Sequence, residues 1–124
     1  MKSYIEQNQT RFLEELFSIL RIQSVSAKSE HKADMYLCAE AIADLLIEAG
    51  ADEAGVCETL GHPVVFGRKI IDPKARTVLI YGHYDVQPVE PLEKWDSDPF
   101  EPVVPDGAIW GRGAHDDKRQ LFMR

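Results

Sequence analysis

The sequence predicts an α/β fold, in which helices pack against a mixed, mostly parallel sheet as part of a three-layer sandwich. Three observations support this class. Two segments near the start of the chain have helical periodicity, two short β-branched segments follow them, and an unbroken apolar run at 77–83 is typical of a strand covered on both faces. Elements of both kinds in a chain of 124 residues form layers around one core. We therefore treat residues 1–124 as one structural unit.

Two helices are predicted before any strand. The first covers residues 4–22, because its apolar side chains recur at i, i+3, i+4 and i+7, on one face. The second follows the polar segment at 24–31, with Ser29 as its expected N-cap, Asp34 in its first turns and Gly50 just beyond its end. The core-facing positions of the first helix are Leu13, Leu16, Phe17 and Leu20. Those of the second are Met35, Ala39, Ile42, Leu46 and Ala49.

Extended segments fill the rest of the chain. Residues 55–59 and 63–69 flank a turn and predict a β-hairpin, in which His62 is structural. The apolar run at 77–83 predicts the central strand. Five of the seven prolines lie between residues 88 and 107, which predicts a long ordered loop with a tight turn at its end. Residues 108–110 predict a returning strand, and a short helix follows.

The composition is that of an ordinary globular protein. Hydrophobic residues make up 44% and charged residues 28% of the chain, and the net charge is −7 at pH 7. An acidic chain without a cluster of lysine and arginine is not expected to bind nucleic acid or an anionic membrane. The sequence contains no apolar run near the ~20 residues of a membrane span and no readable secretory signal, so we expect a cytoplasmic location. Cys38 and Cys57 lack CxxC spacing, which favours buried free thiols.

A histidine and an aspartate follow the end of the predicted central strand. His83 and Asp85 lie at i and i+2, so their side chains point to the same side of an extended backbone. Open α/β sheets bind ligands at this end of a strand. A neutral imidazole is a good zinc ligand, and a neighbouring carboxylate can fix its tautomer. Taken alone, the pair is better explained by a loop histidine with an ordinary hydrogen bond.

Two adjacent carboxylates, Asp116 and Asp117, follow a glycine turn at 111–113. A carboxylate can bind a cation and can bridge two metal ions. The simpler interpretation of this pair alone is a helix N-terminus, where acidic side chains cap backbone N–H groups and interact favourably with the helix dipole. His115, which precedes them, is expected to face solvent.

Together, these features resemble the zinc-dependent metallopeptidase family 20. The resemblance rests on GHYDVQP at 82–88, WDSDPFEP at 95–102 and IWGRGAHDDK at 109–118, and GHPVVFG at 61–67 is similar to the dipeptidase-like branch. That family includes carnosine-type and other dipeptidases, carboxypeptidase G, aminoacylase, acetylornithine deacetylase and succinyl-diaminopimelate desuccinylase. The resemblance implies a zinc-peptidase-like catalytic domain that cleaves peptide (amide) bonds by zinc-activated water.

The resemblance also implies roles for individual residues. His83 corresponds to a zinc ligand, and Asp85 corresponds to the catalytic carboxylate that orients and polarises it. Asp116 corresponds to the carboxylate that bridges two zinc ions. Asp117 corresponds to the residue joined to that aspartate through a cis peptide, and it is not expected to bind metal. Cobalt or manganese could replace zinc at such a site.

Supporting positions follow in the same way. Gly111, Arg112 and Gly113 correspond to the turn that aims the bridging carboxylate. One position departs from the family pattern, because relatives have glycine where this chain has Arg119. By this resemblance, residues 1–124 form the amino-terminal portion of the catalytic domain. The remainder of that domain, with its general base and further metal ligands, and the inserted dimerisation domain are absent.

We therefore expect part of a metal-dependent dipeptidase-like hydrolase that is inactive by itself and whose complete form acts on small peptides. The alternative is a non-catalytic chain that stands alone or oligomerises and binds metal weakly or not at all. Under either interpretation the chain could form a homo-oligomer or pair with the missing carboxyl-terminal part, because an incomplete α/β domain exposes strand edges and apolar surface.

Overall fold

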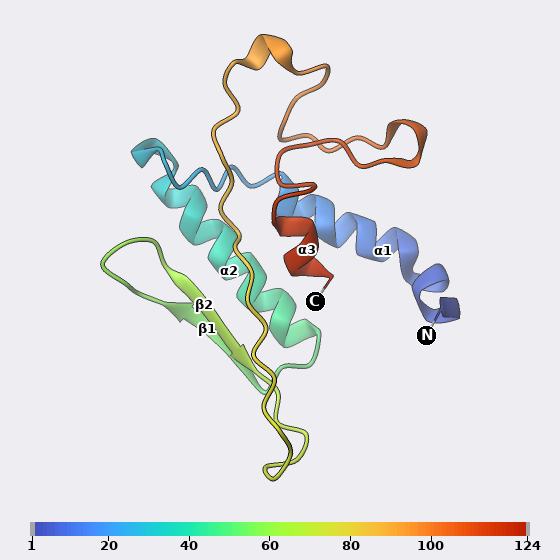
Figure 1. Ribbon diagram of the computed structural model, residues 1–124, viewed down its shortest axis with the longest axis vertical. Helices are drawn as coiled ribbons and strands as arrows, with labels where there is room; N and C mark the ends of the chain where they lie inside the picture. The colour runs from blue at the N-terminus through green and yellow to red at the C-terminus, as the bar shows by residue number, and fades with distance from the viewer. Residues whose placement is uncertain (1, 124) are drawn as a thin grey trace.

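The computed structural model describes residues 2–123, which form two long helices, a β-hairpin and a long loop that returns to a short helix (Figure 1). The hairpin packs on one side of the second helix, and the last helix packs against the first. The α-helices are α1 (Lys2–Leu20), α2 (Lys32–Glu48) and α3 (Lys118–Phe122). The strands are β1 (Glu53–Cys57) and β2 (Val64–Arg68), and single 3-10 turns are η1 (Ser29–His31), η2 (Leu92–Lys94) and η3 (Pro105–Gly107).

Both long helices form where the apolar periodicity predicts them. Leu16, Ile19 and Leu20 of α1 are buried, and on α2 the predicted core positions Met35, Ala39 and Ile42 are buried. Toward the end of α2, Leu46 and Ala49 are exposed, so the prediction that these two residues face the core is wrong. The apolar face of α2 is covered only along the part that meets the hairpin and α1.

The ends of α2 are predicted in part. Ser29 is not its N-cap, because residues 29–31 form η1 and His31 takes the cap position without a side-chain cap hydrogen bond. Instead, the His31 ring lies 2.7 Å from a carboxylate oxygen of Asp34, which is in the first turn as predicted. Gly50 follows the helix with φ 96°, the left-handed conformation for which glycine has no steric penalty.

The hairpin is confirmed, and it is the whole sheet within residues 2–123. Its strands are antiparallel, with Glu53 opposite Arg68 and Cys57 opposite Val64. One face packs on α2, and the other leaves Val64 and Phe66 exposed. In the turn, the His62 Nε2–H donates to the Ser26 carbonyl at 3.0 Å, which is the structural role predicted for it.

The predicted central strand at 77–83 is wrong for this structure. These residues belong to no strand, and Val78, Leu79 and Ile80 are 79, 90 and 58% exposed. A buried strand needs partner strands on both edges and covering elements on both faces. Within residues 2–123 no strand pairs with 77–83, so the mixed, mostly parallel sheet and the three-layer sandwich are not formed.

The proline-rich segment is an ordered loop, as predicted. It contains a cis Glu90–Pro91 peptide bond, η2, and the tight turn η3, in which Asp106 and Gly107 have φ of 52° and 79°. The returning strand predicted at 108–110 is reduced to one antiparallel bridge between Val103 and Trp110. In Figure 1 this loop extends away from the two long helices before the chain comes back to α3.

The core gathers side chains from every long element. Ile19 of α1 and Cys38 and Ile42 of α2 form its buried centre. Partly buried residues packed around that centre are Ile22, Leu45, Val65, Tyr84, Leu121 and Phe122. Because Tyr84 lies within the motif at 82–88 and Leu121 follows the motif at 109–118, the core directly supports both. None of the helices within residues 2–123 has the length and apolar character needed to cross a membrane.

The two cysteines are free thiols in different surroundings. Cys38 is fully buried, as predicted, whereas Cys57 is exposed at the end of β1, so its predicted burial is wrong. Burial raises the pKa of the Cys38 thiol, and neighbouring Lys118 only partly offsets that effect. Thiolate is the reactive form of cysteine, so Cys38 combines low access with a low thiolate fraction.

We predict that one thiol of the native chain reacts rapidly with an aromatic disulfide reagent and that the second reacts only after unfolding. The release of the coloured thiolate, followed by absorbance, measures both phases. In Cys57→Ser the fast phase should disappear while the slow one stays. Two fast thiols in the native chain would contradict the burial of Cys38.

Candidate metal centre

The candidate centre is built around the ring of His83, which lies between two carboxylates. Its Nδ1 is 3.0 Å from Oδ1 of Asp85, and its Nε2 is 3.2 Å from Oδ1 of Asp116. The backbone N–H of His83 donates to Oδ2 of Asp117 at 3.2 Å. The structure therefore brings together the four residues that the sequence singled out in two separate motifs.

The hydrogen-bond partners of the ring define its protonation. Nδ1 also lies 3.2 Å from the backbone carbonyl of Asp85, which can only accept a hydrogen bond, so Nδ1 carries the hydrogen. In the neutral ring the lone pair is then on Nε2 and faces the Asp116 carboxylate. Burial opposes the charged form of His83, but the hydrogen bonds to Asp85 and Asp116 outweigh it and raise the pKa of the imidazole.

Asp116 and Asp117 have opposite environments. They are joined by a cis peptide bond, as the resemblance implies. The Asp116 carboxylate is 74% exposed and points toward His83, whereas Asp117 is buried with 7% of its surface exposed. Asp117 thus binds the backbone of the neighbouring segment, which leaves Asp116 as the acidic side chain that is open to a ligand. His115 is exposed, as predicted.

The turn before these aspartates is fixed by close packing. Gly113 has φ 82°, and a Cβ atom there would lie 3.1 Å from the Lys118 side chain and 3.2 Å from that of Val86. Only glycine fits this position without displacing a neighbour. Gly111 lies just before it, and a Cβ there would meet Pro99 and Pro102 at ordinary contact distance.

Arg112 connects this turn to the proline-rich loop. Its guanidinium donates to the Pro88 carbonyl at 2.9 Å and lies over the Trp95 ring, 5.1 Å from the centroid. Its backbone N–H donates to the Pro99 carbonyl at 2.6 Å. The predicted supporting turn therefore contacts the loop at three residues.

Lys118 is the residue of this region that sequence reasoning missed. Its side chain is 1% exposed, and its ammonium donates to the carbonyls of Ile19 and Ile22 at 3.0 and 2.7 Å. Ile19 lies in the last turn of α1 and Ile22 two residues beyond its end, so the positive charge sits where it interacts favourably with the helix dipole. Burial lowers the pKa of Lys118, and nearby Cys38 and Asp85 act in the opposite direction. A lysine directly after two aspartates gives no signal of burial, so only the structure could reveal it.

The donor set fits part of a zinc site. An imidazole nitrogen and a carboxylate oxygen are both zinc ligands, and bonds of about 2.0 to 2.2 Å at a tetrahedral angle place two donors roughly 3.4 Å apart. The separation of 3.2 Å between Nε2 of His83 and Oδ1 of Asp116 is close to that value. Within residues 2–123, however, no group of three or more His, Cys, Asp or Glu side chains is placed to hold a metal ion.

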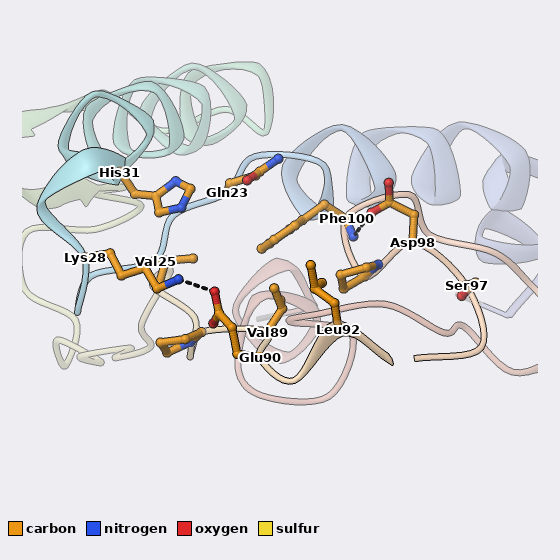
Figure 2. A pocket seen from close by; sticks show the side chains of 12 residues that line it. Gln23, Val25, Lys28, His31, Val89, Glu90, Leu92, Ser97, Asp98 and Phe100 are labelled. Carbon is orange, nitrogen blue, oxygen red and sulfur yellow. Dashed lines mark hydrogen bonds and ion pairs between the residues drawn. The ribbon is translucent and has the colours of Figure 1, made fainter. Parts of the chain in front are cut away.

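One cavity lies away from this centre. It has a volume of about 530 Å³ and lies between the segment after α1 and the proline-rich loop, with Val25, Val89, Leu92 and Phe100 among its walls (Figure 2). Lys28 and Glu90 form an ion pair across it. None of His83, Asp85 and Asp116 lines this cavity, so its size has no bearing on the candidate centre.

The motifs and their geometry agree with comparisons to known proteins. Residues 79–124 match the model of Peptidase family M20/M25/M40. The chain is similar to the Cys-Gly metallodipeptidase DUG1 of Saccharomyces cerevisiae, with 30% identity over 133 residues, which cover 95% of this chain and 27% of the relative.

Solved structures give the same result. The chain is similar to the di-peptidase Dug1p from Saccharomyces cerevisiae, with a TM-score of 0.84 and 29% identity over 94% of this chain and 27% of the other. It is also similar to human carnosine dipeptidase 1, with a TM-score of 0.84 and 30% identity over 97% of this chain and 28% of the other. The chain thus spans about a quarter of the length of these relatives.

We predict that Lys118→Ala lowers the free energy of unfolding by about 1–3 kcal/mol, because it removes two buried hydrogen bonds from an ammonium and the packing of the side-chain stem. Denaturant titration followed by circular dichroism measures this change. Arg119→Ala, one position along α3, is the matched control and should stay within about 0.5 kcal/mol of the original chain. Equal stability of the two variants would contradict the anchoring role of Lys118.

Proposed function

We propose that the chain contributes part of the metal centre of a dipeptidase-like hydrolase that cleaves peptide bonds. The observation that carries this proposal is the His83 ring, whose Nε2 faces the Asp116 carboxylate at 3.2 Å while Nδ1 is held by Asp85. Two electron-pair donors that face each other at this distance need a cation between them. A proton or a metal ion can fill that role, and the names of the similar metallodipeptidases favour the metal ion.

Each side chain then has a defined task. His83 and Asp116 would hold zinc, which cobalt or manganese could replace. Asp85 accepts the Nδ1–H and keeps the imidazole in the tautomer whose Nε2 can donate its lone pair. Zinc bound there supplies a Lewis acid for the peptide carbonyl and activates water. Asp117 binds the backbone of His83 and stays outside the ligand set, and the turn at 111–113 aims Asp116.

This chain alone is expected to be a weak metal binder. Two protein ligands are fewer than the three or four that zinc sites use. We propose that residues 1–124 correspond to the amino-terminal portion of the catalytic domain and that the remaining length of the relatives supplies the other ligands and the general base. Small peptides are the substrates proposed for the complete protein.

We predict that zinc titration by calorimetry detects weak binding to the original chain. His83→Ala and Asp116→Ala should each lower the zinc affinity by at least roughly 10- to 100-fold, the loss that follows removal of an outer-shell partner. His115→Ala removes an adjacent but exposed histidine and is the matched control, with unchanged binding expected. The same samples should hydrolyse Gly-Leu at no more than the background rate. Binding that survives in both site variants, or turnover that depends on His83, would contradict the proposal.

A second candidate function is supported by the exposed apolar segment. Val78, Leu79 and Ile80 form a continuous apolar stretch whose residues are 58 to 90% exposed. Such a segment tends to find another strand or apolar surface. A non-catalytic chain that pairs with a second copy of itself is therefore the alternative to the hydrolase.

We predict that light scattering over a concentration series shows an increase in mass, which Leu79→Lys reduces by placing a charge in the apolar stretch. Leu60→Lys is the matched control, because Leu60 is fully exposed in the hairpin turn and lies outside that stretch. A strictly monomeric chain at every concentration would exclude self-association.

A further inference from the structure

The segment at 24–26, which the sequence analysis treated only as a break between helices, lies directly beside the segment at 84–86. Val25 and Val86 form a parallel bridge, and the Val86 N–H donates to the Ser24 carbonyl at 2.9 Å. The Ser24 hydroxyl donates to the Tyr84 carbonyl at 2.7 Å. Ser24, Val25 and Val86 are buried, so the register of the two segments is fixed on both sides of Asp85.

Within this register Ser26 reaches the carboxylate of Asp85. Its hydroxyl donates to Oδ2 at 2.5 Å, while Oδ1 of the same carboxylate lies 3.0 Å from Nδ1 of His83. Each oxygen of the Asp85 carboxylate is thus engaged by a different partner. A carboxylate held at both oxygens cannot rotate about its last side-chain bond without breaking one of the two contacts.

We propose that Ser26 is a positioning residue, which fixes the Asp85 carboxylate so that it holds the Nδ1–H tautomer of His83 and leaves the Nε2 lone pair toward Asp116. Ser26 does not touch the proposed metal position, so its effect passes through Asp85. The effect of Ser26 on metal affinity rests on the proposed function. Its effect on the His83 tautomer does not, because that effect is expected in the metal-free chain.

The supporting observation is the way the backbone holds Ser26 itself. The carbonyl of Ser26 accepts a hydrogen bond from Nε2–H of His62 at 3.0 Å, so the hairpin turn also holds the backbone of this residue. Ser26 therefore belongs to an ordered segment that is held by buried neighbours and by the hairpin. A hydroxyl held in this way can orient a carboxylate, which a mobile surface serine could not do.

The first experiment uses the metal-free chain and long-range ¹H–¹⁵N correlation NMR of His83 at a pH where the imidazole is neutral. The original chain should show the Nδ1–H tautomer. Ser26→Ala should shift the population toward the Nε2–H tautomer, and Ser26→Thr, which keeps the hydroxyl, should restore it. Ser24→Ala is the matched control, because its hydroxyl binds the backbone of Tyr84, and it should keep the original tautomer.

The second experiment measures Co²⁺ affinity by absorption titration of the same variants. Ser26→Ala should weaken binding about 10- to 100-fold, as expected for an outer-shell partner, and Ser26→Thr should recover most of it. A tautomer shift in Ser26→Ala without Co²⁺ binding in any variant would support the positioning role and reject the proposed metal site. An unchanged tautomer in a folded Ser26→Ala chain would overturn the role of Ser26, whatever the metal result.

Discussion

The contact on which the rest of the structure depends joins the buried ammonium of Lys118 to the carbonyls of Ile19, in the last turn of α1, and Ile22, just beyond its end. It joins residues 96 to 99 positions apart in the sequence and closes the chain on itself. A buried ammonium is costly unless its hydrogens are bound, and the end of a helix supplies carbonyl oxygens together with a favourable dipole. Because Lys118 directly follows Asp116 and Asp117, the contact that closes the fold also places the carboxylates of the candidate centre.

A second connection complements the first. The segment at 24–26 continues from the end of α1 and pairs with 84–86, so the same end of one helix positions both the His83 side and the Asp116 side of the centre. Gly113 is needed where these parts meet, because its missing Cβ leaves room for the side chains of Lys118, Val86 and Leu20. The centre is thus assembled from three segments that are distant in sequence, and the end of α1 is their common support.

Sequence reasoning succeeded where the signal is local. The helical stripes, the hairpin and the positive φ of Gly50 depend on neighbouring residues, and the structure confirms them. The proximity of Asp116 to His83 and Asp85 could be predicted only through resemblance. Spacing in the sequence does not predict a contact between residues more than 30 positions apart. Lys118 and Ser26 were missed since their importance comes from partners in distant segments, and a polar residue in a polar stretch gives no sign of them.

The wrong central strand and the incomplete donor set have one physical explanation. A strand becomes regular when neighbours satisfy its backbone groups, and a zinc site becomes strong when enough ligands converge on it. Both conditions require partner segments that residues 2–123 do not place beside 77–80 and further ligands that they do not place around His83. The apolar run therefore forms no regular strand, and the His83–Asp116 pair lacks a third metal ligand within these residues. His83 lies at the end of the segment 77–83 and belongs to the candidate centre. A strand that paired with this segment would therefore also fix the position of His83. We expect sheet formation and metal affinity to be coupled for this reason.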